Sequence, residues 1–327
     1  MVCWKSLRLG LLLIAGLPVP LLADSLSIKV ENDLLSYEDD DGHYSGGLEL
    51  FWSFEPDNGH WARGLAEALP GWAGDEVQTL AYRFGMQGYT PEDLRSRELI
   101  EDDRPYAGLL FLGVSMYAER DETNQRVSRE LHLDTGLVGP GTGVGKVQHW
   151  IHKHINATEP RGWKHQLRNE PFLNVAYGQQ WWRQGQLFGL ELEYAPTAGL
   201  ALGNLYTYAS AGGVLRFGRH LERSQGIPSV TPAQSGSQYF TPLGHFAWYG
   251  FLGLEGRYMA YNLLLDGNTF KSSHSVDREE WVGDALAGLA LTWSRWQLTF
   301  VSVWRTHEFR GQQGHDQFGS VTLSYGF

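Results

Sequence analysis

Residues 321–327 read VTLSYGF and place an apolar side chain at every second position, ending on Phe327. A period of two is the repeat of a β-strand, in which neighbouring side chains point to opposite faces. Residues 26–30, LSIKV, have the same alternation near the other end of the chain. Both segments therefore predict strands with one apolar and one polar face.

The same alternation recurs along the whole chain, in twelve segments. Single-chain bacterial outer-membrane barrels require an even number of strands, and this count is even. Residues 244–264 contain no turn pair, so we treat them as one strand. The sequence predicts an all-β fold: a twelve-stranded antiparallel transmembrane β-barrel with a short helix in an extracellular loop. The segments are 26–30, 48–54, 80–86, 110–116, 127–137, 172–183, 188–194, 204–219, 244–264, 280–293, 296–309 and 316–327.

Long polar connections alternate with short turns, which is typical of the extracellular and periplasmic ends of such barrels. Connection 55–76 departs from this order, because a first strand that starts in the periplasm makes it a long periplasmic one. It also contains an expected helical piece at residues 61–69. We expect the other long connections at the extracellular end: 35–43, 89–104, 139–171, 220–243 and 265–279.

A soluble β-sandwich or a large secreted barrel would alternate in the same way. The first 23 residues favour a membrane protein, because Lys5 and Arg8 precede a short apolar run and Ala23 offers a small residue for cleavage. We expect residues 1–23 to be a signal peptide and residues 24–327 to be the barrel. The ending on Phe327 also resembles the C-terminal signal of outer-membrane barrel proteins.

The composition excludes other classes of protein. A formal net charge of −11 does not suit binding to nucleic-acid phosphates. Cys3 is the one cysteine, so neither an intrachain disulfide nor a thiolate metal cluster can form. After the leader, apolar runs such as 109–117 are too short for a transmembrane helix. No pattern in the sequence indicates an oligomeric state.

The first segment with chemical potential is Glu31-Asn32-Asp33, at the end of the first predicted strand. Asn32 is in phase with the apolar face and therefore points outward, where a polar amide is costly without a partner. Asp33 points the other way unless the strand ends there. A hairpin to residues 41–47, DGHYSGG, would bring Ser45 near Asn32. The alternative is a turn-initiating Asn-Asp pair beyond the membrane.

The second segment is a predicted helix in connection 139–171, at residues 145–155. Gln148 and His152 are four residues apart and share a face next to an apolar row. Such an amphipathic helix can lie against the outer wall of the barrel and enclose a site, where a histidine is suited to act as general base. The alternative is a solvated loop histidine. The apolar row is Val147, Ile151 and Ile155.

Two other chemistries were weighed at these residues. Ser45 is a candidate nucleophile, because serine, histidine and a polar orienting group suffice for such catalysis. However, the chain has no G-x-S-x-G elbow. A zinc site is disfavoured, since no spacing among the candidate histidines is a strong zinc signature. Those candidates are His149, His152, His154 and His165.

Clustered motifs resemble those of the lipid A 3′-O-deacylase family of Gram-negative outer membranes, over essentially the whole mature chain. The resemblance implies a twelve-stranded barrel that removes the 3′-linked acyl or acyloxyacyl chain of lipid A, the anchor of lipopolysaccharide, by calcium-dependent ester hydrolysis. It also implies a site outside the barrel wall, beneath a helix from an extracellular loop. The motifs are E-N-D (31–33), D-G-H-Y-S-G-G (41–47), R-P-Y-A-G (104–108), G-L-V-G-P (136–140), V-Q-H-W-I-H-K (147–153), G-W-x-x-Q-L-x-x-E-P (162–171) and L-D-G-N-T-F (265–270).

Carried over by motif, the resemblance implies five catalytic residues. His152 would be the general base that activates water, while Asp33 and Asn32 would hold Ca²⁺. Gln148 and Ser45 would position the ester or complete the oxyanion hole. The family usually has threonine where this chain has Ser45, and that exchange keeps the hydroxyl.

The family also places a lysine and a glutamate at the site. The lysine should lie in the loop after the third predicted strand, where this chain offers Arg95 and Arg97 and no lysine. The glutamate position falls near Thr158 or Glu159. We expect the two arginines and Lys153 to meet the phosphates of lipid A.

Two other functions compete with this interpretation. One is a phospholipase-type barrel with Ser45 as covalent nucleophile. The other is a non-enzymatic porin or structural barrel. Against a porin, twelve strands enclose a narrow lumen, and bulky residues such as Arg83 and Glu191 occupy inward positions.

Overall fold

The fold is described from a computed structural model. It describes residues 24–35, 43–68, 72, 77–122, 125–224, 227, 230–231, 234–235, 240 and 246–327. The predicted signal peptide, residues 1–23, lies outside the described residues.

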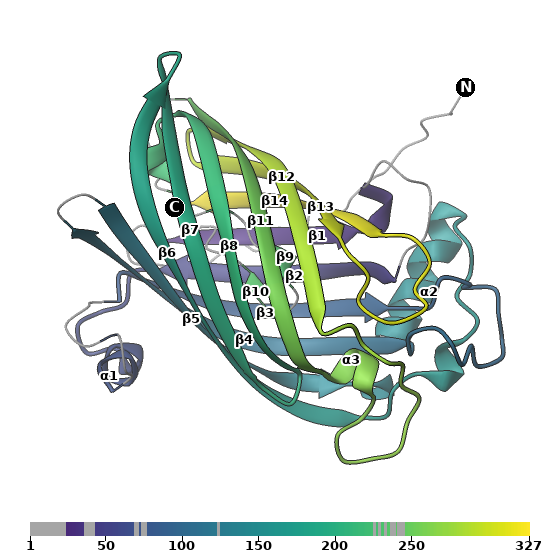
Figure 1. The fold of residues 1–327 in the computed structure, drawn as a ribbon. Helices are drawn as coiled ribbons and strands as arrows, with labels where there is room; N and C mark the ends of the chain where they lie inside the picture. Colours follow the sequence, from purple (N-terminus) through teal and green to yellow (C-terminus); the bar gives the residue numbers. More distant parts are fainter. Residues whose placement is uncertain are drawn as a thin grey trace, which may run out of the picture.

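Twelve long strands close into one antiparallel barrel (Figure 1). The first strand closes the barrel against the last, from Ser25 opposite Gly326 to Asn32 opposite Gly319. The predicted fold class is confirmed, and the segment 244–264 indeed forms a single barrel strand. The strands are β1 (Ser25–Asn32), β2 (Tyr44–Phe54), β3 (Thr79–Tyr89), β4 (Ala107–Glu122), β5 (Gln125–Val138), β6 (Glu170–Leu187), β7 (Leu190–Gly203), β8 (Tyr206–Arg219), β11 (Ala247–Asn262), β12 (Trp281–Trp293), β13 (Trp296–Arg305) and β14 (Asp316–Gly326), and a separate pair is formed by β9 (Val230–Thr231) and β10 (Gln234–Ser235).

Apolar side chains of the barrel strands point outward, and polar side chains point inward. In β1, Lys29 and Glu31 are buried, whereas Ile28 and Val30 are 41% and 45% exposed. An outer surface of this kind is stable in lipid, which satisfies apolar groups but no open backbone edge. The alternation therefore belongs to a membrane barrel rather than to a soluble sandwich. None of the helices in the described part of the chain is long and apolar enough to cross a membrane.

Ion pairs fill one side of the lumen. Lys29 Nζ lies 3.1 Å from a carboxylate oxygen of both Glu31 and Glu49. Arg83 forms a further ion pair with Asp134 and lies 3.4 Å from Glu49. All five side chains are buried, and buried charges of this kind need such partners.

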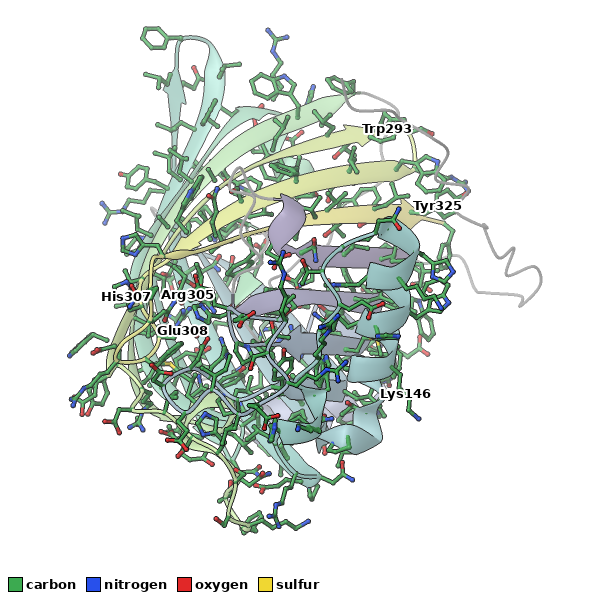
Figure 2. All side chains as sticks on the ribbon, turned by 90° about the vertical axis from the view of Figure 1, so that its right-hand side faces the viewer. Lys146, Trp293, Arg305, His307, Glu308 and Tyr325 are labelled. Carbon is green, nitrogen blue, oxygen red and sulfur yellow. The ribbon has the colours of Figure 1, made fainter. Side chains whose placement is uncertain are left out.

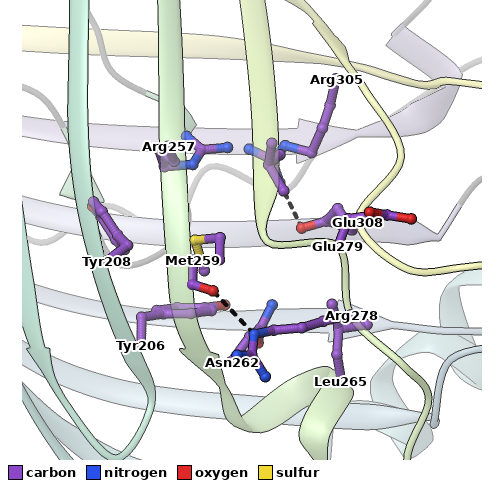
Figure 3. A pocket seen from close by; sticks show the side chains of 11 residues that line it. Tyr206, Tyr208, Arg257, Met259, Asn262, Leu265, Arg278, Glu279, Arg305 and Glu308 are labelled. Carbon is purple, nitrogen blue, oxygen red and sulfur yellow. Dashed lines mark hydrogen bonds and ion pairs between the residues drawn. The ribbon is translucent and has the colours of Figure 1, made fainter.

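A second cluster fills the other side of the lumen. Asp284 accepts hydrogen bonds from Arg257 and Arg305, each at 2.9 Å. A cavity of about 20 Å³ lies beside them, lined also by Tyr208 and Glu308 (Figure 3). That volume holds about one water molecule. The lumen is packed with side chains here and offers no space for a lipid.

The two ends of the barrel carry different connections (Figure 1). One end carries α2 (Val144–Ile155) and α3 (Leu263–Asp266), whereas α1 (Trp61–Glu67) lies at the other and confirms the helical piece expected there. The expectation for connection 220–243 is wrong. β8 ends at Arg219 beside Trp248, which puts this connection at the α1 end. Strand order decides the end at which a connection emerges, and the length of the connection does not.

Candidate active site

A β-bulge shapes the first part of the site, at the start of β2. The pairing of β2 with β3 shifts register between Tyr44 and Gly46, so Ser45 is an extra residue. Gly46 has a φ of 143°, and a Cβ there would lie 2.7 Å from the carbonyl oxygen of Glu31. Only glycine fits this conformation and this close approach. Bulges re-aim side chains locally, and this one sets the position of Ser45.

Asn32 lies in the outward phase of β1, as predicted from the sequence. Its Nδ2 donates a hydrogen bond to the backbone oxygen of Ser45 at 2.7 Å. Because a carbonyl oxygen only accepts, this bond fixes the orientation of the amide, with Oδ1 as the other end. The strand ends at Asn32, and Asp33 begins the short 3₁₀-helix η1 (Asp33–Leu35), where its side chain is buried.

Thr90 joins the site, although no sequence pattern marks it. It directly follows β3 and is fully buried. Its Oγ1 lies 2.7 Å from Ser45 Oγ, so the two hydroxyls share a hydrogen bond. In the sequence Thr90 falls in the predicted connection 89–104, and nothing there indicates its place beside Ser45.

Helix α2 lies on the outer wall across the ends of the first strands (Figures 1 and 2). It starts over β3 and β4, where Val144 packs against Gly88 and Gly108. A Cβ on Gly108 would lie 2.8 Å from Val144 Cβ, so the missing side chain lets the helix approach the wall. Figure 2 shows the helix running from there toward β2 and β1.

The helix buries a mainly polar row against the barrel. Val144, Gln148 and His152 are its buried residues. The amphipathic pattern therefore predicts the helix correctly, but its apolar row does not pack against the barrel. In a bilayer this is physically consistent, because lipid can cover an apolar row that the protein leaves exposed. The exposed row, at 38–46% exposure, is Val147, Ile151 and Ile155.

His152 is held in one orientation by the end of its own helix. The helix stops at Asn156, which adopts a left-handed conformation, and the chain turns back. His152 Nδ1 then lies 2.5 Å from the backbone oxygen of Thr158. That oxygen only accepts, so Nδ1 must carry the proton and Nε2 carries the lone pair when the ring is neutral. Thr158 thus contributes a carbonyl near the position expected for a glutamate, while Glu159 is exposed.

Gln148 is hydrogen-bonded to Trp163, a residue of the motif G-W-x-x-Q-L to which the sequence assigns no role. Trp163 Nε1 donates to Gln148 Oε1 at 2.8 Å. Gln148 Nε2 is buried and has no hydrogen-bond partner among the described residues. One row of α2 therefore presents a buried amide donor and, one turn later, His152.

The predicted cations lie outside this buried row. Arg95, Arg97 and Lys153 are all exposed at the surface. The loop that carries the two arginines is tied to the segment after α2, because Arg161 N donates to Leu94 O at 2.9 Å. No hydrogen bond or ion pair described for the site residues above involves one of these three cations.

The histidines considered for zinc do not converge. His154 Nδ1 bonds to the carbonyl oxygen of Trp150 on its own helix, at 2.7 Å. Within the described residues, the one group of three metal-ligating side chains is formed by Glu191, His220 and Glu222, at the opposite end of the barrel. Two of those three are exposed, and Glu191 already accepts hydrogen bonds from backbone N–H groups.

An imidazolium cluster supports the bulge from inside the barrel mouth. His43 precedes Tyr44 and lies 2.7 Å from Asp316 and 3.4 Å from Asp103. Burial by itself lowers the pKa of His43, but its hydrogen bonds to the two carboxylates outweigh burial and raise the pKa to about 9. The same contact holds the pKa of Asp103 below its usual value, against the effect of burial. His43 is therefore a charged anchor for the start of β2.

A closed barrel with apolar side chains on its outer face defines the class of the protein: an outer-membrane β-barrel of Gram-negative bacteria, here with the polar row of α2 against its outer wall. The chain belongs to the family described as outer membrane protein LpxR, whose model matches residues 9–327. This is the lipid A deacylase family that the sequence motifs resemble.

One solved structure shows the same architecture, and a second is less similar. LpxR from Salmonella typhimurium aligns with a TM-score of 0.77 at 21% identity, over 93% of this chain and 100% of that chain. The β-domain of the Bordetella autotransporter BrkA aligns with a TM-score of 0.46 at 10% identity, over 93% and 98% of the two chains. The first likeness shows the fold. No curated protein matches the chain.

Proposed function

We propose that this protein hydrolyses the ester that links the 3′ acyl or acyloxyacyl chain to lipid A in the outer leaflet. The observation that carries the proposal is the position of His152, a buried imidazole on the same row of α2 as Val144, which packs against the outer wall of the barrel. An ester that reaches this place comes from the bilayer and not through the lumen. Membership of the LpxR family supports the same activity.

The orientation of His152 supports its role as general base. With Nδ1 donating to Thr158, the basic Nε2 takes a proton from a water molecule, and the water oxygen attacks the ester carbonyl carbon. When the tetrahedral intermediate collapses, the imidazolium returns that proton to the oxygen of the departing sugar. The acyl chain leaves as a carboxylic acid, so one water is consumed for each ester cleaved.

A divalent cation fits the residues at the end of β1. Asn32 offers an amide oxygen and Asp33 a buried carboxylate, which are the hard oxygen ligands that Ca²⁺ prefers. The bond from Asn32 Nδ2 to Ser45 leaves Oδ1 as the end suited to a cation. We therefore assign Asn32 and Asp33 to hold Ca²⁺. When bound, Ca²⁺ supplies positive charge that stabilises the developing oxyanion.

The exposed cations suit the headgroup of the proposed substrate. Arg95, Arg97 and Lys153 are exposed; Lys153 is on α2, and the loop with the two arginines is bonded to the segment after α2 through Arg161 N and Leu94 O. Lys146, on the same helix, projects away from the barrel in Figure 2. Guanidinium and ammonium groups bind phosphates through charge-assisted hydrogen bonds. We assign the first three to the phosphates of lipid A.

Two other functions fit the geometry less well. A covalent mechanism needs Ser45 next to a base, but the described partner of Ser45 Oγ is the hydroxyl of Thr90. A porin needs an open lumen, whereas Arg83 and Asp284 belong to buried ion-pair clusters that project into it.

The test uses purified protein refolded in detergent with lipid A, and mass spectrometry of the lipid as readout. We expect lipid A to lose the mass of the 3′ acyl or acyloxyacyl group with Ca²⁺ present, and to stay intact with a chelator or with Asp33→Asn. Calcium should also raise the unfolding temperature of the wild type but not that of Asp33→Asn. Intact lipid A with a folded barrel, shown by circular dichroism and heat-modifiable gel mobility, contradicts the proposal. Phospholipid cleavage or pore conductance under the same conditions supports the respective alternative.

A further inference from the structure

The bond between Trp163 and Gln148 determines which end of the Gln148 amide can meet a ligand. An indole N–H is a donor only, so the group that lies 2.8 Å from Trp163 Nε1 must be the amide oxygen. The NH₂ end of the amide then points elsewhere, and it is buried without a hydrogen-bond partner among the described residues. Leaving a buried donor unsatisfied costs stability, so such a group in a site calls for a ligand.

Trp163 is itself fixed on three sides. Its ring packs against that of Tyr106, with centroids 5.1 Å apart. It also covers the backbone of α2 at Gly145, where a Cβ would lie 2.7 Å from the indole. Gln166 Nε2 donates to the Trp163 carbonyl at 2.9 Å. The indole is therefore a rigid support for the amide and not a mobile surface ring.

Gln148 and Asn32 have the same functional group but present opposite ends of it. Asn32 Nδ2 is bound to a carbonyl oxygen, which makes its oxygen the end suited to a cation. Gln148 Oε1 is bound to an N–H group, which makes its nitrogen the end suited to an anion. One amide is thus set as an acceptor and the other as a donor.

We propose that Trp163 is a positioning residue, which holds Gln148 so that Nε2 donates a hydrogen bond to the carbonyl oxygen of the scissile ester as that oxygen becomes negative. Gln148 lies one turn from His152 on the same buried row of α2, so its donor and the base act on the same ester. This inference rests on the proposed ester hydrolysis and assigns one of its oxyanion donors. An oxyanion donor acts mainly in the transition state, so its loss lowers kcat more than it changes KM.

The first test is Trp163→Phe, which keeps an aromatic ring against Tyr106 and Gly145 but removes the N–H group. We expect kcat for lipid A to fall about 10- to 100-fold with KM changed by less than about threefold, because the amide can then turn its oxygen toward the ester. The matched control is Trp150→Phe, a 61% exposed tryptophan on α2, which should keep wild-type kinetics.

The second test is a double-mutant cycle with Gln148→Ala. If Trp163 acts through Gln148, Trp163→Phe should cause little further loss in the Gln148→Ala background. Gln148→Glu accepts the bond from Trp163 but has no NH₂ group, so we expect it to be as impaired as Gln148→Ala. A merely structural tryptophan would instead give additive losses, and an active Gln148→Glu would show that the NH₂ group is not an oxyanion donor.

The bond can also be observed without turnover. The indole N–H resonance of Trp163, labelled with ¹⁵N, should lie downfield in the wild type and move toward the free-indole position in Gln148→Ala. If the wild type is active and folded Trp163→Phe is equally active, this inference is overturned and the proposed function stands. No wild-type turnover overturns both, even where the N–H shift shows the bond. If Trp163→Phe does not fold, Gln148→Glu decides the assignment.

Discussion

The lumen and the outer wall of this barrel differ in the kind of buried polar group that they contain. In the lumen, Arg83 is paired with Asp134, and Arg305 with Asp284. On the outer wall, Gln148 keeps a buried NH₂ group that no described residue uses. A buried charge needs its partner, whereas a buried donor that the described residues leave unbonded beside the outer wall can bind a ligand. From this difference we expect the inside of the barrel to contribute to stability and the proposed hydrolysis to take place outside it.

The largest effect is expected for the base on the outer wall. His152→Ala should lower kcat for lipid A by about 10³-fold or more, since general bases contribute about 10²- to 10⁴-fold and the ring also shapes the site. The unfolding temperature should change little. His154→Ala, which removes an exposed histidine two residues away, should remain active in the same mass-spectrometric assay. An active His152→Ala protein would contradict the assignment of the catalytic base to the outer wall.

The lumen should respond in the opposite manner. Arg83→Met leaves the buried carboxylates of Asp134 and Glu49 without this cation, and breaking a buried pair costs about 3–5 kcal/mol. We expect a lower denaturant midpoint of unfolding but an unchanged kcat for the folded fraction. Lys164→Met is the matched control, because its pair with Glu98 is exposed and worth less than about 1 kcal/mol. Lost turnover in folded Arg83→Met would show that the lumen takes part in catalysis.

The barrel and the contact between Asn32 and Ser45 could be predicted from the sequence, for a physical reason. The alternation of apolar residues fixes which face each strand residue occupies, so the outward position of Asn32 follows from the phase of Leu26, Ile28 and Val30. The predicted approach of Ser45 to Asn32 is confirmed by their 2.7 Å hydrogen bond. Periodicity is a property of neighbouring residues, and these inferences need nothing more.

Other features depend on contacts that periodicity does not encode. The bulge at Ser45 is a one-residue shift in strand pairing, and the sequence shows only the glycines that permit it. Thr90 contacts Ser45, and Trp163 contacts Gln148. Both contacts join residues that are distant in the sequence, so only the three-dimensional structure shows them. The end of the barrel at which connection 220–243 emerges depends on strand order, so the prediction from its length was wrong.

The mouth of the barrel, between lumen and site, should carry a pH dependence. The pKa of His43 is raised to about 9, so the folded protein holds a proton there that the unfolded chain releases near pH 6.5. This contribution to stability is complete below about pH 6.5 and is lost as the pH rises through 9, up to about 3 kcal/mol in total. We expect the denaturant midpoint to fall across that range, and to fall less in His43→Gln. His154→Gln, an exposed control, should keep the wild-type slope, and equal slopes for all three proteins would contradict an imidazolium anchor.

The smallest effect is expected at Ser45, and it separates a supporting role of this hydroxyl from the role of His152 as base. Ser45→Ala removes the hydroxyl that bonds to Thr90 at 2.7 Å but keeps the backbone oxygen that holds Asn32. A neutral hydrogen bond is worth about 0.5–1.5 kcal/mol, so kcat/KM should fall about 3- to 10-fold. Ser45→Thr restores a hydroxyl and should recover most of the activity. Complete inactivity of folded Ser45→Ala, together with a trapped acyl-enzyme in the wild type, would instead identify Ser45 as a covalent nucleophile. A partial loss without an adduct leaves His152 as the group that activates the attacking water, with Ser45 and Thr90 shaping the place where the ester lies.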